Sequence, residues 1–191
     1  MRQSVDTSEG IQASFDNNTT YYKGAAVLRM FEAWIGPDRF QAFIRSYIRT
    51  HMWGTATADD FLAALTAATG PQVTTAFRTF LEQPGVPAVD IALRCTTGGS
   101  TLHLSQRRSL PEDVATPATA TWHIPVCVRY GSRREQRRHC ELLTTRDAAV
   151  PLPGPCPTVL IPNAAGDGYY RSQVTAPSAS LADAWLPSRE R

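Results

Sequence analysis

The 191-residue sequence has no long apolar stretch and little excess of charge of either sign. No apolar run approaches the roughly 20 residues that a membrane-spanning helix requires, so we expect no membrane segment in this chain. The net charge is only +2, which gives no indication of a nucleic-acid partner. Because 42% of the residues are apolar, the composition favours folded domains over a disordered chain.

The sequence also lacks the motifs of a complete active site. It contains no HExxH, P-loop, GxGxxG or GxSxG motif. Its histidines are His51, His103, His123 and His139, and no two of them are four positions apart. A hydrolase needs a nucleophile or a metal, a base and an oxyanion stabiliser. We therefore expect His103 and His123 to be structural or exposed, and the chain alone to hold no catalytic metal.

The N-terminal half shows the periodicity of helices. Between residues 21 and 82, apolar residues recur at spacings of three and four, which predicts four amphipathic helices. Gly36-Pro37 and Gly70-Pro71 are expected to separate helices, and Thr57–Asp60 resembles a capping box with Asp in its last position. The expected buried faces consist of Val27, Leu28, Met30, Phe31, Trp34 and Ile35, then Phe40, Phe43, Ile44, Tyr47 and Ile48, then Phe61, Leu62 and Leu65, and finally Val73, Phe77, Phe80 and Leu81.

The period changes after the breaker cluster Pro84–Pro87. Six short extended runs follow, with turn-rich stretches between them. They are residues 88–94, 101–106, 121–130, 139–144, 158–162 and 169–174. The sequence therefore predicts an α+β chain, with a helical part followed by a small antiparallel β-sandwich.

Two of the four cysteines flank a predicted hairpin turn. If Tyr130 opposes Arg137, the same register places Cys127 opposite Cys140. Directly opposed residues have β-carbons about 4.5–5.5 Å apart, which a small adjustment brings within reach of a disulfide. We therefore expect a bond between Cys127 and Cys140.

The remaining cysteines, Cys95 and Cys156, then form the second expected pair. The alternative is that all four cysteines are buried free thiols. Disulfide bonds would favour a periplasmic or secreted location, because they persist in oxidising compartments.

The segment Arg133–Arg138 concentrates positive charge at the predicted hairpin tip. It could bind an anion, or it could simply keep an exposed turn hydrated. The position at a hairpin tip favours the second interpretation.

The most informative stretch is residues 20–30, TYYKGAAVLRM. Tyr21 and Tyr22 stand at the start of the first predicted helix, where both could be packing residues. Alternatively, one phenol points into a cleft and donates a hydrogen bond to a developing oxyanion while it remains neutral.

This stretch resembles the Y-x-K-G-A-x-V-L-x-M segment of the M1 (gluzincin) zinc aminopeptidases. The similarity continues, in the order found in that family, from about residue 10 to residue 176. The further matching segments are Phe40, Tyr47, Gly54–Thr57 with Asp60-Phe61, Phe80–Pro87 (W-x-x-Q-x-G-x-P), Leu104–Arg107 (L-x-Q-x-R), Trp122–Pro125 (W-x-I-P) and Asn163–Arg171 (N-x-x-x-x-G-(F/Y)-Y-R). Five motifs in sequence make the resemblance specific, although each alone is weak.

The resemblance implies a role for each part of the chain. Residues 1–87 are expected to be the C-terminal helical part of a thermolysin-like catalytic domain, residues 88–176 the following β-sandwich, and residues 177–191 the start of a helical domain. In the family, the tyrosine two positions before the lysine stabilises the tetrahedral intermediate, and this tyrosine corresponds to Tyr21. Tyr22 then occupies the variable position and is the second candidate. The implied substrate is a peptide, cleaved by water activated on a zinc ion.

The chain departs from the family pattern where zinc and substrate bind. The G-x-M-E-N and HExxH motifs are absent, and so is the downstream glutamate ligand. The resemblance therefore implies that zinc belongs to a parent enzyme whose missing catalytic and helical domains supply its ligands, and that the isolated chain is inactive. The alternative is a non-catalytic peptide- or protein-interaction module on the same scaffold. A sandwich that binds peptides by strand addition explains less, because it leaves the helical half without a role.

Overall fold

The computed structural model describes residues 7–10, 21–110 and 120–175. The chain divides into two compact units, Met1–Pro84 (unit 1) and Gly85–Arg191 (unit 2). This division lies close to the boundary that the sequence predicts after Pro87. The segment 177–191, expected to begin a helical domain, lies outside the described residues.

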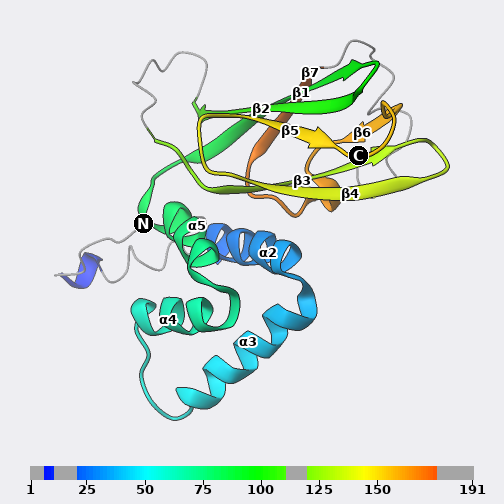
Figure 1. The fold of residues 1–191 in the computed structure, drawn as a ribbon. Coiled ribbons are helices and arrows are strands. Elements are labelled where there is room, and N and C mark those ends of the chain that lie inside the picture. The colour runs from blue at the N-terminus through cyan, green and yellow to red at the C-terminus, as the bar shows by residue number, and fades with distance from the viewer. Residues whose placement is uncertain (1–6, 11–20, 111–119, 176–191) are drawn as a thin grey trace. The chain divides into compact units, whose positions relative to one another are not determined.

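Unit 1 contains the four expected helices (Figure 1). They are α2 (Gly24–Ile35), α3 (Pro37–Thr50), α4 (Ala58–Thr69) and α5 (Pro71–Glu82). Gly36 and Gly70 each end one helix and begin the next, with φ angles of 99° and 97° that favour glycine. The proline that follows each glycine occupies the first helical turn, where its missing N–H costs nothing.

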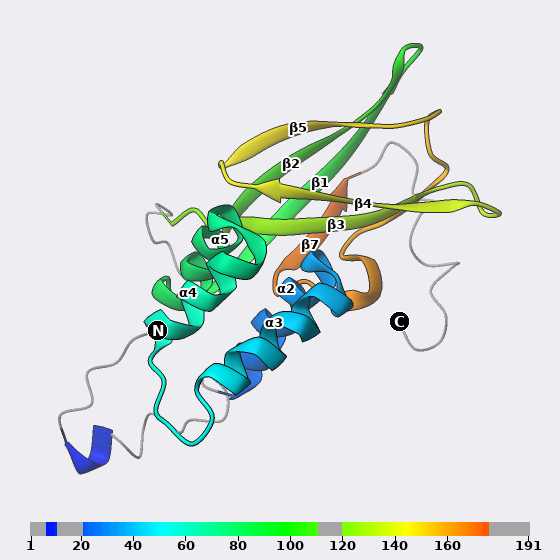
Figure 2. The ribbon, with the colours of Figure 1, turned by 60° about the horizontal axis from the view of Figure 1, so that its bottom comes forward.

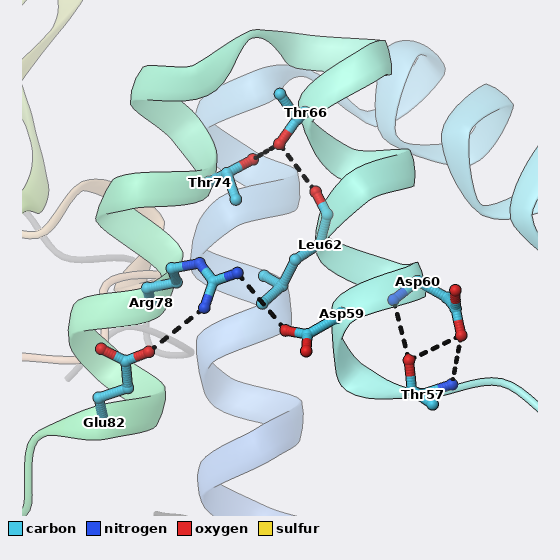
Figure 3. A network of polar contacts seen from close by, with 8 residues as sticks. All are labelled: Thr57, Asp59, Asp60, Leu62, Thr66, Thr74, Arg78 and Glu82. Atoms are coloured by element: carbon cyan, nitrogen blue, oxygen red, sulfur yellow. Dashed lines mark hydrogen bonds and ion pairs between the residues drawn. The ribbon is translucent and has the colours of Figure 1, made fainter.

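Helix α4 begins with the expected capping box (Figure 3). The Asp60 backbone N–H donates to the Thr57 hydroxyl at 3.2 Å, and the Thr57 backbone N–H donates to the Asp60 carboxylate at 2.8 Å. These bonds satisfy two donors that the helix itself leaves unpaired. The Thr57 hydroxyl also donates to the Asp60 carboxylate at 2.7 Å, and this bond, together with that of the Thr57 backbone N–H, lowers the pKa of the Asp60 carboxyl.

Further along, helices α4 and α5 are joined by a polar contact that Figure 3 shows. The hydroxyls of Thr66 and Thr74 lie 2.7 Å apart, and Thr66 also donates to the Leu62 carbonyl at 2.8 Å. Arg78 of α5 adds exposed ion pairs with Asp59 and Glu82. Because exposed ion pairs contribute little, the buried apolar contacts hold these helices together.

The core of unit 1 is built on aromatic rings. Phe31 is completely buried, and its ring meets Phe77 and Phe80 edge to face, with centroids 4.9 Å and 6.0 Å apart. One expectation about this core is wrong, because Ile48 is exposed on α3. Phe61, which borders a cavity, is only half-buried, and so are Leu28, Trp34, Ile35, Phe40, Ile44, Tyr47 and Leu81.

The described part of unit 2 forms two sheets (Figures 1 and 2). The strands are β1 (Val86–Thr96), β2 (Gly99–Ser109), β3 (Ile124–Gly131), β4 (Gln136–Leu143), β5 (Asp147–Leu152), β6 (Val159–Ile161) and β7 (Arg171–Thr175). One sheet has the order β5-β2-β1-β7 and the other the order β4-β3-β6. Figure 2 shows β3 and β4 as one long hairpin in the second sheet.

Two features of unit 2 differ from the sequence-based expectation. The strand pairs are not all antiparallel, because β7 lies parallel to β1, with Val174 opposite Ile91. The chain reaches β7 from β6 in the other sheet, and this crossover permits the parallel direction. Strand β5 was not expected, because Pro151 and neighbouring alanines are poor strand formers. It is an edge strand, where a proline is tolerated.

A buried glutamine joins three segments of unit 2. The Gln106 side-chain amide donates to the carbonyls of Trp122 and Thr145, both at 2.8 Å, and its oxygen accepts from the Trp122 backbone N–H at 2.9 Å. The Gln106 backbone N–H donates to the Arg146 carbonyl at 2.8 Å. Gln106 therefore satisfies buried backbone groups before β3 and between β4 and β5, which explains a polar side chain in this core.

All four cysteines are paired in the structure. Strands β3 and β4 adopt the expected register and join Cys127 to Cys140, with Cα atoms 4.0 Å apart. The second bond joins Cys95 to Cys156, with Cα atoms 5.6 Å apart. These are the two pairs that the sequence predicts, and they leave no free thiol.

Candidate active site

Tyr21 and Tyr22 lie in a π-helical turn, residues 21–23, that runs directly into α2. Their side chains are 52% and 68% exposed. Neither tyrosine is therefore a core residue of unit 1 as the structure describes it. Short π-helical segments occur frequently at functional sites, and this one keeps two phenols accessible at a helix start.

The first turn of α2 has no side-chain cap. Lys23 occupies the N-cap position without a capping hydrogen bond, and the first turn contains no acidic residue. Lys23 itself has helical φ and ψ angles of −64° and −45°, and residues 21–23 continue into α2 without a break, so Lys23 does not mark the end of a helical segment.

The Lys23 side chain instead reaches across unit 1. Its ammonium group donates to the backbone carbonyl of Gln83 at 3.5 Å. Gln83 is the C-cap residue of α5, and the negative end of that helix dipole favours a cation. Partial burial lowers the pKa of Lys23 because it removes water from the charged form.

A cavity of about 490 Å³ lies within unit 1, next to Lys23. Its walls are mainly apolar and include Val27 and Leu28 of α2 and Phe77 and Phe80 of α5. Among the described residues, Lys23 is the only charged side chain that lines it. This volume is within the range of small-molecule and substrate pockets, roughly 300–1,000 Å³.

The described residues do not form a metal site. Within residues 7–10, 21–110 and 120–175, no three His, Cys, Asp or Glu side chains come together as metal ligands would. His51 stacks near Tyr47, with ring centroids 4.9 Å apart, and His139 lies 3.8 Å from the Glu141 carboxylate. His103 is exposed on β2 and His123 is half-buried. The residues that the structure describes therefore do not fit a zinc ion.

The arginine-rich segment forms the exposed turn between β3 and β4. The turn is closed by a hydrogen bond from the Ser132 N–H to the Glu135 carbonyl at 2.8 Å. Gly131 has a φ of 142°, and a β-carbon there would overlap the Glu135 carbonyl oxygen. Arg137 pairs with Glu135 at 3.0 Å in solvent. These contacts agree with a hydrated turn, and they bring no set of arginines around a common point.

The Asn163–Arg171 motif precedes and enters β7, and its second tyrosine is buried. Asn163 exchanges two hydrogen bonds with the Gly168 backbone, at 2.7 Å and 3.0 Å, which closes the loop. Burial raises the pKa of Tyr170 to about 12, and the nearby Cys127 backbone and Arg138 charge offset only part of this increase. Tyr170 is therefore a structural residue whose ionisation should destabilise unit 2.

We expect unit 2 to lose stability as the pH rises from about 10 to about 12. The unfolded chain ionises Tyr170 near the ordinary value of 10.0, whereas the folded chain keeps the proton to about 12, so the stability is complete below pH 10. Two pKa units correspond to about 2–3 kcal/mol. Urea unfolding of wild-type and Tyr170→Phe protein between pH 9 and 12 measures this difference. The exposed Tyr22→Phe variant is the control, and an unchanged pH dependence in Tyr170→Phe would contradict the assignment.

The comparisons with known proteins agree on one family. Residues 1–80 match the peptidase family M1 domain. Over 134 residues, or 67% of the chain, the sequence is 32% identical to aminopeptidase A of Gloydius brevicauda, of which 13% is covered. Over 193 aligned residues, or 98% of the chain, it is 24% identical to the puromycin-sensitive aminopeptidase of Caenorhabditis elegans, of which 20% is covered. The chain belongs to the M1 peptidase family, whose named relatives here are aminopeptidases.

The fold agrees with this family. The structure matches the crystal structure of Legionella pneumophila aminopeptidase A in complex with aspartic acid, with a TM-score of 0.69. The match covers 85% of this chain and 18% of that chain, at 12% identity, and it concerns the fold alone. The chain spans only 13% and 20% of the length of the two relatives named above. In the part of the chain that is described, no helix has the length and apolar character to cross a bilayer.

Sequence reasoning singled out Tyr21 as a candidate but gave no role to Lys23 and did not predict the cavity beside it. Lys23 was already visible as the lysine of the Y-x-K-G segment and as the single lysine in the sequence. Its partner Gln83 is 60 residues away, and no local pattern links the two positions.

Proposed function

We propose that this chain is the segment of an M1 metalloaminopeptidase that contributes Tyr21 as oxyanion donor during removal of N-terminal residues from peptides. The observation that carries the proposal is the accessible phenol of Tyr21 in a π-helical turn, inside the segment that matches the family. The family resemblance of residues 21–30 selects Tyr21 over Tyr22.

The proposed role of Tyr21, donation of a hydrogen bond to the oxyanion, suits a neutral phenol. A phenolic hydroxyl donates one hydrogen bond, and it gains strength as negative charge develops on the scissile carbonyl oxygen. The interaction is therefore stronger in the transition state than in the bound substrate, which is the requirement for raising kcat. The π-helical turn would hold this donor at the start of α2.

The zinc ion of this proposal belongs to the complete enzyme. Since the described residues offer no ligand set, its ligands and the general base must come from sequence other than the described part of this chain. Tyr21 would complete a site that those residues build. We accordingly expect the 191-residue chain alone to hydrolyse nothing.

The proposed assignment of segments to domains follows the order found in the family. Residues 1–87 would be the helical end of the catalytic domain, residues 88–176 the β-sandwich, and residues 177–191 the start of a helical domain. Large apolar side chains exposed in unit 1 support a larger assembly. Ile48, Met52 and Trp53 are 57%, 59% and 97% exposed around the end of α3, as expected for a surface that packs on further sequence.

A non-catalytic interaction module is the second candidate function. The absence of a metal-ligand cluster among the described residues is the observation that favours it. The peptidase proposal gives Tyr21 and Tyr22 a reason to be exposed, whereas the module requires a partner to cover them.

The sequence and activity of the complete reading frame that encodes this chain distinguish the two candidate functions. We expect that frame to contain HExxH with a glutamate about 20 residues later. Its product should bind zinc and release N-terminal residues from a peptide, whereas the 191-residue chain should do neither. A complete frame without that motif, whose product binds no zinc, would contradict the peptidase and support the module.

A further inference from the structure

Lys23 is a half-buried cation in the helical segment that carries Tyr21. Its φ and ψ angles of −64° and −45° are helical, and residues 21–23 continue into α2 without a break. It is also the single lysine in the sequence, because every other Lys/Arg position is an arginine.

The Lys23 ammonium group has a hydrogen-bond partner on another helix. The Lys23 ammonium group donates to the carbonyl of Gln83, at the C-terminal end of α5. That end carries the negative pole of the dipole and carbonyls without helical partners. The side chain thus connects the first residue before α2 to the residue that closes α5.

The link from Lys23 lies beside the cavity of about 490 Å³, which Gly24, Val27 and Leu28 of α2 and Phe77, Phe80 and Leu81 of α5 help to line. Further along α2, Phe31 packs directly on Phe77 and Phe80, so apolar contacts hold that part of the helix against α5. The bond from Lys23 to the Gln83 carbonyl adds a polar contact with the end of α5 in the segment that carries Tyr21.

We propose that Lys23 is a positioning residue for Tyr21, and that its bond to Gln83 holds the π-helical turn from which the Tyr21 phenol projects. This inference rests on the proposed function of Tyr21. Tyr21 and Lys23 lie in the same π-helical segment, so a restraint on Lys23 limits the motion of the phenol. An oxyanion donor acts only when it is already in place, and small displacements reduce its effect strongly.

The test compares Lys23→Met and Lys23→Arg in the complete enzyme. Methionine keeps an apolar stem but cannot bind the Gln83 carbonyl. The bond from Tyr21 to the oxyanion would then weaken, and this bond forms only in the transition state. We therefore expect kcat to fall about tenfold with little change in KM. Arginine keeps the cation and should restore most of the lost kcat. Arg29→Met, an exposed basic residue of the same helix, is the matched control and should retain the wild-type kcat.

A double-mutant cycle with Tyr21→Phe separates this inference from the proposed function. If Lys23 acts through Tyr21, adding Lys23→Met to Tyr21→Phe should lower kcat no further. A full tenfold loss in the Tyr21→Phe background, or no loss in Lys23→Met alone, would overturn the positioning role while leaving the function of Tyr21 intact. If Tyr21→Phe itself leaves kcat unchanged, the proposed function fails instead.

Folding is checked on the 191-residue chain. The Lys23→Met chain should keep its helical circular dichroism and its urea midpoint close to those of the wild type. If unit 1 of that variant unfolds, Lys23→Arg decides the question by itself. An arginine variant that folds normally and yet has the tenfold loss would also overturn the proposal, because it preserves the cation and the link.

Discussion

Replacing Tyr21 by phenylalanine should lower the kcat of the complete enzyme by about 10²–10³-fold, with smaller changes in KM. This is the typical loss when one oxyanion donor is removed, and it corresponds to about 2.7–4 kcal/mol of transition-state stabilisation. Phenylalanine keeps the ring and removes only the donor, so the effect isolates the hydroxyl. Steady-state hydrolysis of an aminoacyl anilide, with zinc content measured on the same preparation, provides the test.

Tyr22→Phe is the matched control for this prediction. It changes the neighbouring residue, which is also exposed, in the same chemical way. We expect its kcat to stay within about twofold of the wild type. A large loss in Tyr22→Phe together with a normal Tyr21→Phe would reverse the assignment of the two phenols.

The largest effect on stability is expected from Gln106→Leu. Leucine is similar in size but leaves the Trp122 N–H and the carbonyls of Trp122 and Thr145 without the bonds that Gln106 provides. Each buried polar group that loses its partner costs about 1–3 kcal/mol, so three groups give about 3–9 kcal/mol, and we expect the lower part of this range because the Thr145 contact is only partly buried. Urea unfolding, with amide hydrogen exchange to locate the change in unit 2, measures it.

The neighbouring Arg107→Leu variant controls for a new leucine on the same strand. Arg107 is exposed, and its ion pair with Asp90 at 3.2 Å lies in solvent. Such pairs contribute about 0–1 kcal/mol, so this variant should be nearly as stable as the wild type. Equal stability losses in the two variants would show that the buried amide network of Gln106 is unimportant.

The helices of unit 1 were predictable because residues at or next to their ends determine where each helix begins and stops. Gly36 and Gly70 adopt φ angles that other residues avoid, and Thr57 and Asp60 bond within a single turn. Each signal acts over a few neighbouring residues, and tertiary packing does not override it. Burial of single side chains was less predictable, and Ile48 is exposed despite its place in the apolar pattern.

The sheets were predictable where a hairpin joins the strands. The register that brings Cys127 opposite Cys140 depends on one turn, and turn geometry is local. The parallel pairing of β1 and β7 depends on a crossover between sheets, which no short pattern encodes. Strand β5 gains its conformation from pairing with β2, against the preference of Pro151.

The candidate site was predictable only in part. Tyr21 emerged as a candidate from the resemblance of its segment to a family motif, since the residues alone favoured packing over catalysis. The link from Lys23 to Gln83 depends on how α2 and α5 meet, and it becomes visible only in three dimensions. The metal ligands of the proposed enzyme were not recoverable, because the described residues contain no such cluster.

The solitary lysine also makes the start of α2 a natural probe position. A protease that cuts only after lysine has a single target in this chain, the bond between Lys23 and Gly24. That bond separates both tyrosines from the helices behind them. Because the lysine side chain is half-buried, the cutting rate would report how often this helix start opens and exposes it.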